Sequence, residues 1–206
     1  MKTRTTATLA LAITAAGSLA LIPTTTPQAV AEAAMNAESF ETDTGHSAAI
    51  FRIKHLGVTN FYGRFNDLSG TFLLDKASPS DSFLQFEIDV ASVDTNSDGR
   101  DRHLKGPDFF NAAQFPTATF QSTSISAGSN DGEFEVTGDL TIRGTTKPVS
   151  FTAMHTGEGD RGPRFGYRAG FETAFEISRS DFGINYLPEG LGDEVKLIVS
   201  VQGVRK

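Results

Sequence analysis

The sequence predicts an all-β protein, an antiparallel barrel of about eight strands with a short helical insertion near one end. The chain has 206 residues, with seventeen Phe, no Trp and no Cys. Many of the Phe recur at every second position of segments whose alternate positions are polar or charged, a period typical of strands with one buried face. Short connections rich in Gly, Pro, Asn and Asp join the segments, so successive strands should be antiparallel neighbours. Closure into a barrel removes exposed strand edges, and a β-sandwich is the alternative that the same alternation allows.

The amino terminus has the pattern of a secretory signal peptide. Lys2 and Arg4 precede an uncharged run, and Ala-Val-Ala at positions 29–31 supplies a cleavage site. No later stretch is long and apolar enough to anchor the chain in a membrane. We therefore expect an exported protein, periplasmic or, where the source lacks an outer membrane, secreted. The predicted divisions are a signal peptide over residues 1–31, a linker over 32–37 and one barrel domain over 38–206.

Nine strand-like segments follow the linker. In the segment over 133–143, Phe134, Val136 and Leu140 share one register, whereas every odd-numbered residue is polar or charged. Such a strand buries one face and exposes the other. The segments span residues 39–44, 47–56, 62–74, 83–93, 118–125, 133–143, 147–155, 167–177 and 194–204.

One insertion interrupts the β pattern. Residues 96–106 predict a short helix, with Asn96 or Ser97 as the N-cap and Gly106 followed by Pro107 as the stop. A helical turn is also expected at a corner of the barrel, over 178–183.

Three Phe follow the helix and are too apolar to be left in water without a partner. We expect residues 98–115 to act as a lid, in which these three Phe close one end of the barrel. They are Phe109, Phe110 and Phe115.

Composition excludes several classes of function. The net charge is −7, without a basic cluster, so the protein is a poor candidate for nucleic-acid binding. The absence of Cys excludes disulfides, thiolate metal sites and thiol nucleophiles. The four His show no chelating spacing such as H-x-H or H-E-x-x-H, and we expect no metal and no cofactor.

Catalytic motifs are equally scarce, and we do not expect an enzyme. The nucleophile motif Gly-x-Ser-x-Gly is absent, and Ser180 with Asp181 is more simply a capped turn. Asp101 and His103 are two residues apart on the predicted helix, so their side chains do not face one another.

Several motifs, in order along the whole predicted domain, resemble the YceI-like family. The opening run from His46 to Gly57 is the first of them, and Gly106-Pro107 is a departure, because Arg-Ser or Lys-Ser is expected there. The other matching motifs are residues 63–65, 70–72, 93–95, 100–104, 108–110, 115–120 and 138–149.

The resemblance implies a lipocalin-like barrel, exported to the bacterial periplasm, whose tunnel holds a polyisoprenoid or a similar amphiphilic chain. It implies a binding protein without a catalytic constellation. Transport or storage of an isoprenoid quinone or prenyl phosphate, and a role in stress responses, are the functions it suggests. The alternative is a filled barrel that acts through its surface as a stress-response or interaction protein without a ligand. The sequence leaves open which lipid is bound and whether the protein forms a homodimer.

If the barrel holds a ligand, the inward-facing residues of the strands form the wall of the tunnel, and polar residues at strand ends mark its mouth. Alternation from Phe51 and Ile53 carries His55 inward, and alternation from Ile88 carries Asp94 inward, so these two polar residues should contact the head group. Their alternative roles are a satisfied rim histidine and a cap of the turn into the helix. The residues expected to contact the tail are Phe51, Ile53, Phe65, Phe72, Phe86, Ile88, Phe120, Phe134, Leu140, Phe151, Phe171 and Phe175.

Overall fold

Strands account for most of the chain that the computed structural model describes, residues 38–206. The predicted signal peptide and linker lie outside the described residues. The helical elements are α2 (Asp98–Leu104) and the 3-10 turns η1 (Thr44–His46), η2 (Pro79–Asp81), η3 (Val90–Ser92) and η4 (Arg179–Phe182). The strands are β1 (Glu38–Thr42), β2 (Ala48–His55), β3 (Thr59–Phe65), β4 (Leu68–Leu74), β5 (Phe83–Asp89), β6 (Val93–Asp94), β7 (Thr117–Ala127), β8 (Glu133–Ile142), β9 (Thr145–Asp160), β10 (Tyr167–Ser178) and β11 (Leu191–Arg205).

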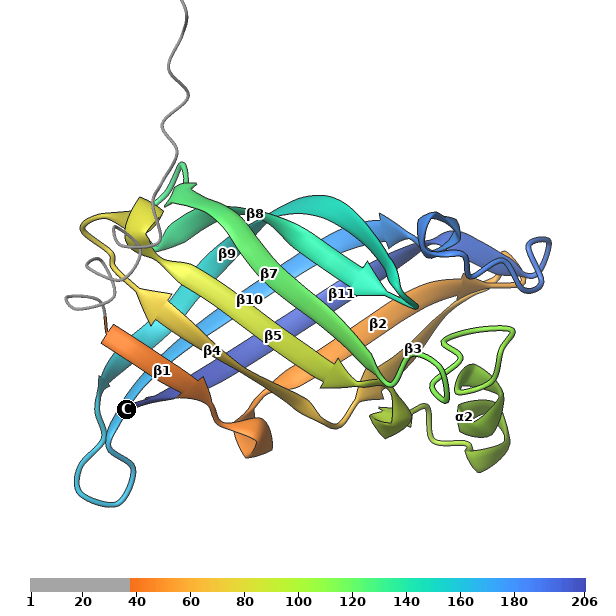
Figure 1. Cartoon of the computed structure of the whole chain (residues 1–206), viewed down its shortest axis with the longest axis horizontal. Coiled ribbons are helices and arrows are strands. Elements are labelled where there is room, and N and C mark those ends of the chain that lie inside the picture. The colour runs from red at the N-terminus through yellow and green to blue at the C-terminus, as the bar shows by residue number, and fades with distance from the viewer. Residues whose placement is uncertain (1–37) are drawn as a thin grey trace, which may run out of the picture.

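The strands close into an antiparallel barrel (Figure 1). Around the barrel the order is β1-β4-β5-β7-β8-β9-β10-β11, and the pairing of β1 with β11 completes the circle. Strand β2 follows β1 and pairs with the same neighbouring strand, β11. Strand β3 in turn pairs with β2. The predicted barrel is therefore confirmed, and closure rules out the sandwich.

Three adjacent strands of the barrel are interrupted midway along their length. Turn η1 separates β1 from β2, residues 66–67 separate β3 from β4, and η3 separates β5 from β6. The prediction of unbroken strands over 62–74 and 83–93 is wrong at these points. At η1 and η3 the cause is an Asp side chain: Asp43 accepts a hydrogen bond from the Gly45 amide, and Asp89 accepts one from the Ala91 amide. Such local bonds compete with the ladder of the sheet.

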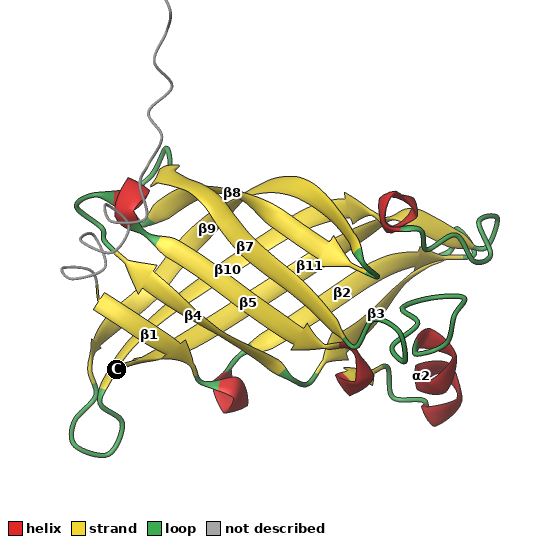
Figure 2. Ribbon diagram, in the orientation of Figure 1, coloured by secondary structure: helices red, strands yellow, loops and turns green. Residues whose placement is uncertain are grey.

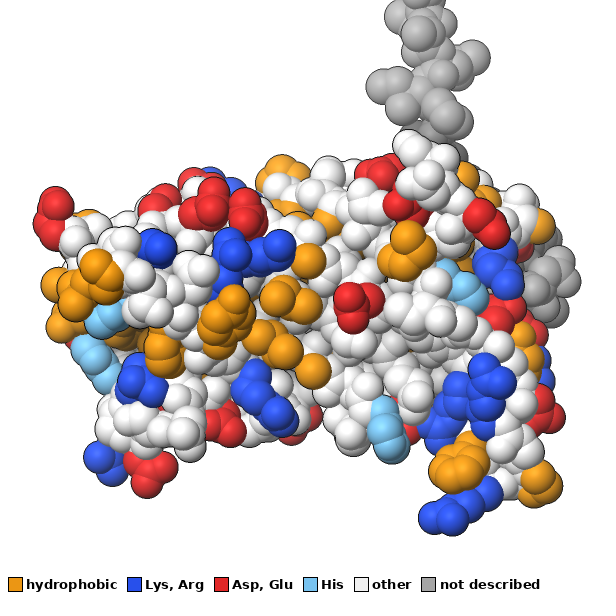
Figure 3. All heavy atoms as spheres, turned by 180° about the vertical axis from the view of Figure 1, so that it is seen from behind, with side chains coloured by type: hydrophobic (Ala, Val, Ile, Leu, Met, Phe, Trp, Pro, Cys, Tyr) orange, Lys and Arg blue, Asp and Glu red, His pale blue; other side chains and the backbone are white. Residues whose placement is uncertain are grey.

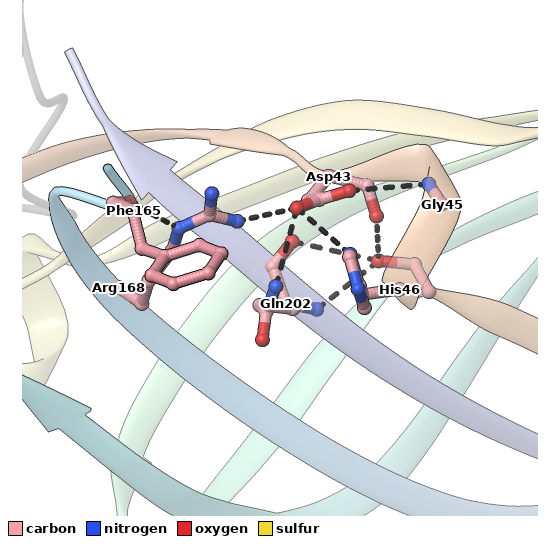
Figure 4. Close-up of polar contacts among 7 residues, drawn as sticks. Asp43, Gly45, His46, Phe165, Arg168 and Gln202 are labelled. Carbon is pink, nitrogen blue, oxygen red and sulfur yellow. Dashed lines mark hydrogen bonds and ion pairs between the residues drawn. The ribbon is translucent and has the colours of Figure 1, made fainter. Parts of the chain in front are cut away.

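A polar network fixes the break between β1 and β2 (Figure 4). The Asp43 carboxylate forms an ion pair with Arg168 of β10 and accepts a hydrogen bond from Gln202 Nε2 of β11 at 3.2 Å. His46 Nδ1 lies 3.0 Å from the same carboxylate. Burial raises the pKa of Asp43, but the hydrogen bonds from Arg168 and His46 outweigh it and lower that pKa to about 2.

We predict that Asp43→Asn destabilises the barrel in a pH-dependent way. A carboxyl whose pKa is lower in the folded state than in the unfolded chain stabilises the fold above pH ~4, and this contribution disappears as the pH falls to about 2. At pH 7 we expect a loss of about 1–2 kcal/mol, a few degrees in Tm. Thermal unfolding followed by circular dichroism should show the two proteins converging below pH 4. Glu38→Gln is the control, because Glu38 pairs with Arg205 where both side chains are more than 40% exposed, and such pairs contribute little.

Helix α2 lies at one end of the barrel (Figure 2), which we call the open end. The helix lies within the predicted range, with Ser97 as the N-cap residue and Gly106 after its end. Turn η4 occupies the predicted corner over 178–183. Among the residues that the structure describes, no helix has the length and hydrophobicity needed to span a membrane.

Candidate functional site: an apolar cavity inside the barrel

The barrel encloses a cavity of about 450 Å³. Its lining comes from every strand except β1 and β6, and from α2, η3, η4 and the loops beside α2 and η4. The volume is within the range of small-molecule sites, about 300–1,000 Å³. The cavity reaches the surface at the open end, where two of its lining residues, Tyr186 and Leu187, are 40% and 46% exposed.

The inward phenylalanines show that this interior is hollow. In a filled core such rings would be fully buried, because protein interiors are close-packed. Here several inward-facing rings that line the cavity keep part of their surface accessible from within. The sequence allowed either a filled barrel or a hollow one, and the structure shows a hollow barrel with a cavity. These half-buried rings are Phe65, Phe86, Phe120, Phe151, Phe171 and Phe175.

Glycines on neighbouring strands explain why the rings leave the space open. A Cβ on Gly63 would lie 2.2 Å from Cζ of Phe51, its cross-strand partner. A Cβ on Gly138 would lie 2.5 Å from Cζ of Phe120. Each ring therefore covers a glycine of the next strand and lies along the wall. A larger residue in place of the glycine would direct the ring toward the lumen.

The opposite end of the barrel, the closed end, is filled by aromatic rings. Phe40 and Phe72 stack with centroids 4.8 Å apart and are 0% and 1% exposed. Phe171 meets Phe72 edge-on at 5.5 Å and also lines the cavity. The Phe72–Phe171 contact is therefore the floor of the cavity.

Polar residues cover this floor from outside. Lys76, which follows β4, forms an ion pair with Glu158 of β9, and these two strands lie on opposite sides of the barrel. Beneath the pair, His155 Nε2 lies 3.4 Å from the Glu158 carboxylate without a hydrogen bond, and the imidazole is 5.3 Å from the Phe171 ring. Burial lowers the pKa of His155 and outweighs the opposite effect of the nearby Glu158 carboxylate. The lowered pKa favours the neutral imidazole.

Aromatic contacts join the lid to the loop after η4 at the open end. The rings of Phe109, His103 and Tyr186 lie 5.0–5.1 Å from one another. Arg143, at the turn between β8 and β9, donates hydrogen bonds to the carbonyls of Phe109 at 2.9 Å and Gly183 at 3.1 Å. Two loops and one turn therefore converge over the mouth.

Arg179 is a buried residue of the lining that the sequence analysis did not identify. Its guanidinium donates to four backbone carbonyls, those of Ile184, Tyr186, Leu191 and Gly192, at 2.8–3.1 Å. Burial lowers the pKa of Arg179, while Asp193 opposes that shift. The residue holds the loop at the open end in place. Continued alternation from Phe175 would have revealed it, since an inward arginine at a strand end requires a partner.

Most of the predicted tail residues come together in the cavity. Phe72 and Phe134 do not: Phe72 supports Phe171 at the floor but is itself outside the lining, and Phe134 packs with Ile125 and Val136 in a buried cluster. The predicted tail residues found in the lining are Phe51, Ile53, Phe65, Phe86, Ile88, Phe120, Leu140, Phe151, Phe171 and Phe175.

The two residues predicted at the mouth lie in different places. His55 lines the cavity near its mouth. Asp94 does not: its carboxylate accepts hydrogen bonds from Asn66 Nδ2 at 3.2 Å and from the Asn96 amide at 2.9 Å, and these bonds lower its pKa. The expectation that Asp94 points inward is wrong because η3 interrupts the alternation before β6.

Only two of the three lid phenylalanines line the cavity. Phe109 and Phe110 line the cavity, and Phe110 meets Phe65 edge-on at 5.4 Å. Phe115 lies outside the lining and packs at the turn between β8 and β9, where a Cβ on Gly144 would lie 2.6 Å from its ring.

Comparisons with known proteins find relatives that have the same fold. A model of the YceI-like domain matches residues 40–203. Protein YceI of Escherichia coli is 45% identical over 162 residues, 78% of this chain and 83% of that protein. The crystal structure of Burkholderia cenocepacia BcnA is similar with a TM-score of 0.71 at 26% identity, over 78% of this chain and 98% of that chain. A polyisoprenoid binding domain from Saccharophagus degradans has a TM-score of 0.62 at 16% identity, over 82% and 99% of the two chains, a similarity of fold alone.

Proposed function

Because the chain belongs to the YceI-like domain family, we propose that it is an exported protein that binds a long-chain isoprenoid, or a similar amphiphile, in its barrel. The ligand would be of the isoprenoid quinone or prenyl phosphate type, carried or stored without chemical change. Export rests on the signal-peptide pattern of the first 31 residues. The similar barrel of the Saccharophagus degradans domain supports the idea that this fold can house such a chain.

The observation that carries this proposal is a cavity whose wall is formed mainly by aromatic and aliphatic side chains. Burial of apolar surface contributes about 0.8 kcal/mol for each carbon, so one five-carbon isoprene unit contributes roughly 3–4 kcal/mol before ordering costs are subtracted. A few units then suffice for tight binding. Hydrogen bonds to the head group, about 0.5–1.5 kcal/mol each, would select among ligands more than hold them.

We predict that His55 takes part in this selection and that Asp94 does not. His55→Ala should change the relative affinity for two ligands with the same tail and different head groups by about two- to tenfold, the value of one hydrogen bond. Asp94→Ala is the matched control, since the structure places this carboxylate with Asn66 and Asn96. Competition binding with an isoprenoid alcohol and its phosphate measures the effect. Equal responses of the two variants would show that His55 does not contact the head group.

We predict that ligand protects the lid, residues 98–115, from hydrogen exchange. Phe109 and Phe110 lie over the cavity, so a chain beneath them adds apolar contacts to the segment. Without ligand the lid amides should exchange faster than those of β10 and β11, and with ligand they should slow. Hydrogen-exchange mass spectrometry on both forms provides the measurement. Unchanged lid exchange would place the entry route elsewhere.

Native mass spectrometry with organic extraction, on protein purified from its host, tests the proposal as a whole. A long-chain isoprenoid that co-purifies supports it. Protein free of lipid across several lipid-rich preparations would favour the alternative, a stress-response or interaction protein that acts through its surface. A lipid that is chemically altered during incubation would indicate an enzyme.

A further inference from the structure

Exposed apolar side chains gather at the mouth of the cavity. Leu56 and Val58, in the turn between β2 and β3, are 59% and 80% exposed, and Tyr186 and Leu187 of the loop after η4 are 40% and 46% exposed. We call these four residues the apolar rim. Figure 3 shows hydrophobic side chains toward its left end, the end that carries α2 in Figure 1.

Backbone contacts bring the two halves of the rim together. The Leu56 amide donates a hydrogen bond to the Gly190 carbonyl at 2.7 Å. A Cβ on Gly190 would lie 2.8 Å from Leu187 Cδ2 and 3.3 Å from Leu56 Cδ2, so both leucines pack over this glycine. The two leucines therefore join two segments of the rim that are far apart in the sequence.

The leucines of the rim have an unfavourable backbone conformation. Leu56 has φ of 50° and Leu187 has φ of 48°, a left-handed region that leucine rarely adopts and that asparagine or glycine would occupy more easily. Strained residues of this kind cluster at active sites and ligand-binding sites. Leucine at both positions, where asparagine or glycine would be less strained, supports a role for an apolar side chain at the mouth.

We propose that the apolar rim docks on the surface of a lipid bilayer, so that an isoprenoid tail passes directly between the bilayer and the cavity. This inference rests on the proposed function. A tail that crossed water would expose the whole apolar surface that the cavity buries, and contact between rim and bilayer avoids that step. Tyr and aliphatic side chains at loop tips suit the interfacial region of a membrane.

The size of the rim favours a bilayer over a protein partner. Stable protein interfaces use about 20–30 residues on each side, so a protein partner would need contacts well beyond these four side chains. A bilayer requires no matching surface, because its interface accepts a few inserted side chains.

Charges beside the rim have both signs. Lys54 and Glu189, each two residues from a rim leucine, are exposed, and the exposed charges of the lid are Asp98, Arg100, Arg102 and Asp108. The rim therefore has no net attraction for anionic lipid. Docking should occur on zwitterionic phosphatidylcholine and depend little on salt.

A single Trp tests the docking, since the chain contains none. In Val58→Trp, vesicles of phosphatidylcholine without isoprenoid should shift the emission to shorter wavelength and reduce quenching by iodide. Phe165→Trp is the control, because Phe165 is 50% exposed in the loop between β9 and β10, at the closed end. No shift at position 58, or equal shifts at both positions, would overturn the proposal.

A second variant separates docking from ligand binding. Leu56→Asn with Val58→Ser removes apolar surface outside the cavity lining, and asparagine accepts the φ of position 56. Transfer of the polyprenol solanesol from vesicles should slow at least tenfold, while binding of solanesol from detergent solution stays unchanged. Unchanged transfer would overturn the docking proposal. Failure of the unaltered protein to bind solanesol from detergent would instead overturn the proposed function, and the Trp measurement would still decide on docking.

Discussion

Phe86→Asp should abolish the binding of a long isoprenoid, with a loss of affinity of at least a hundredfold. Phe86 lines the cavity, and its cross-strand neighbour Phe120 lines it too. An unpaired carboxylate in an apolar space costs several kcal/mol, or the site takes up water and loses the tail. Because that environment raises the pKa of a carboxyl, binding should partly recover at low pH, where the introduced group is neutral. Titration with an isoprenoid at pH 5 and pH 8 provides the measurement.

Two further variants make this result interpretable. Glu87→Asp alters the next residue of β5, which is exposed on the outer face, and should leave binding unchanged. Phe86→Leu keeps the wall apolar and should retain most of the affinity, which separates the effect of charge from that of lost aromatic volume. If the variants at positions 86 and 87 respond alike, the assignment of the two faces of β5 is wrong.

Gly63→Val should both destabilise the barrel and weaken tail binding. Even a Cβ at this position would lie 2.2 Å from Phe51, so the ring must move off the wall and into the lumen. Overpacking of this kind costs about 1–3 kcal/mol of unfolding free energy. The displaced ring also occupies space that the tail needs, and we expect affinity to fall at least tenfold. Chemical denaturation and isoprenoid titration measure the two effects.

Gly99→Ala is the matched control for this change. Within residues 38–206, no atom beyond the neighbouring residues and the helix backbone lies within 4 Å of a Cβ at Gly99, which is a residue of α2, so alanine should be neutral or slightly stabilising. Tail affinity that survives Gly63→Val in a folded protein would mean that the Phe51 ring does not define the wall.

Period-2 alternation predicted the wall of the cavity well, because it depends only on the geometry of one strand. It placed Phe86, Phe120 and Phe171 on the inner face, where the structure has them. It failed at Asp94, since the turn η3 shifts the register of everything that follows it. Local hydrogen bonds from Asp89 cause that turn, and alternation takes no account of them.

The hollow interior could not be predicted in the same way. Whether a ring fills the lumen depends on the residue opposite it on the neighbouring strand, as Gly63 shows for Phe51. That pairing is known only when the register of the sheet is known. Phe72 and Phe134 face inward as expected, yet they pack into buried clusters outside the cavity, which is a property of the whole barrel and not of one strand.

The dependence of affinity on tail length tests the central claim, that the barrel interior binds an isoprenoid chain, most directly. Calorimetric titration with isoprenoid alcohols of increasing length would give the binding free energy for each added unit. We predict a gain with every unit until the chain reaches the floor at Phe72 and Phe171, then no further gain, with a negative heat-capacity change that grows in parallel. An affinity that is independent of tail length would contradict binding in the cavity.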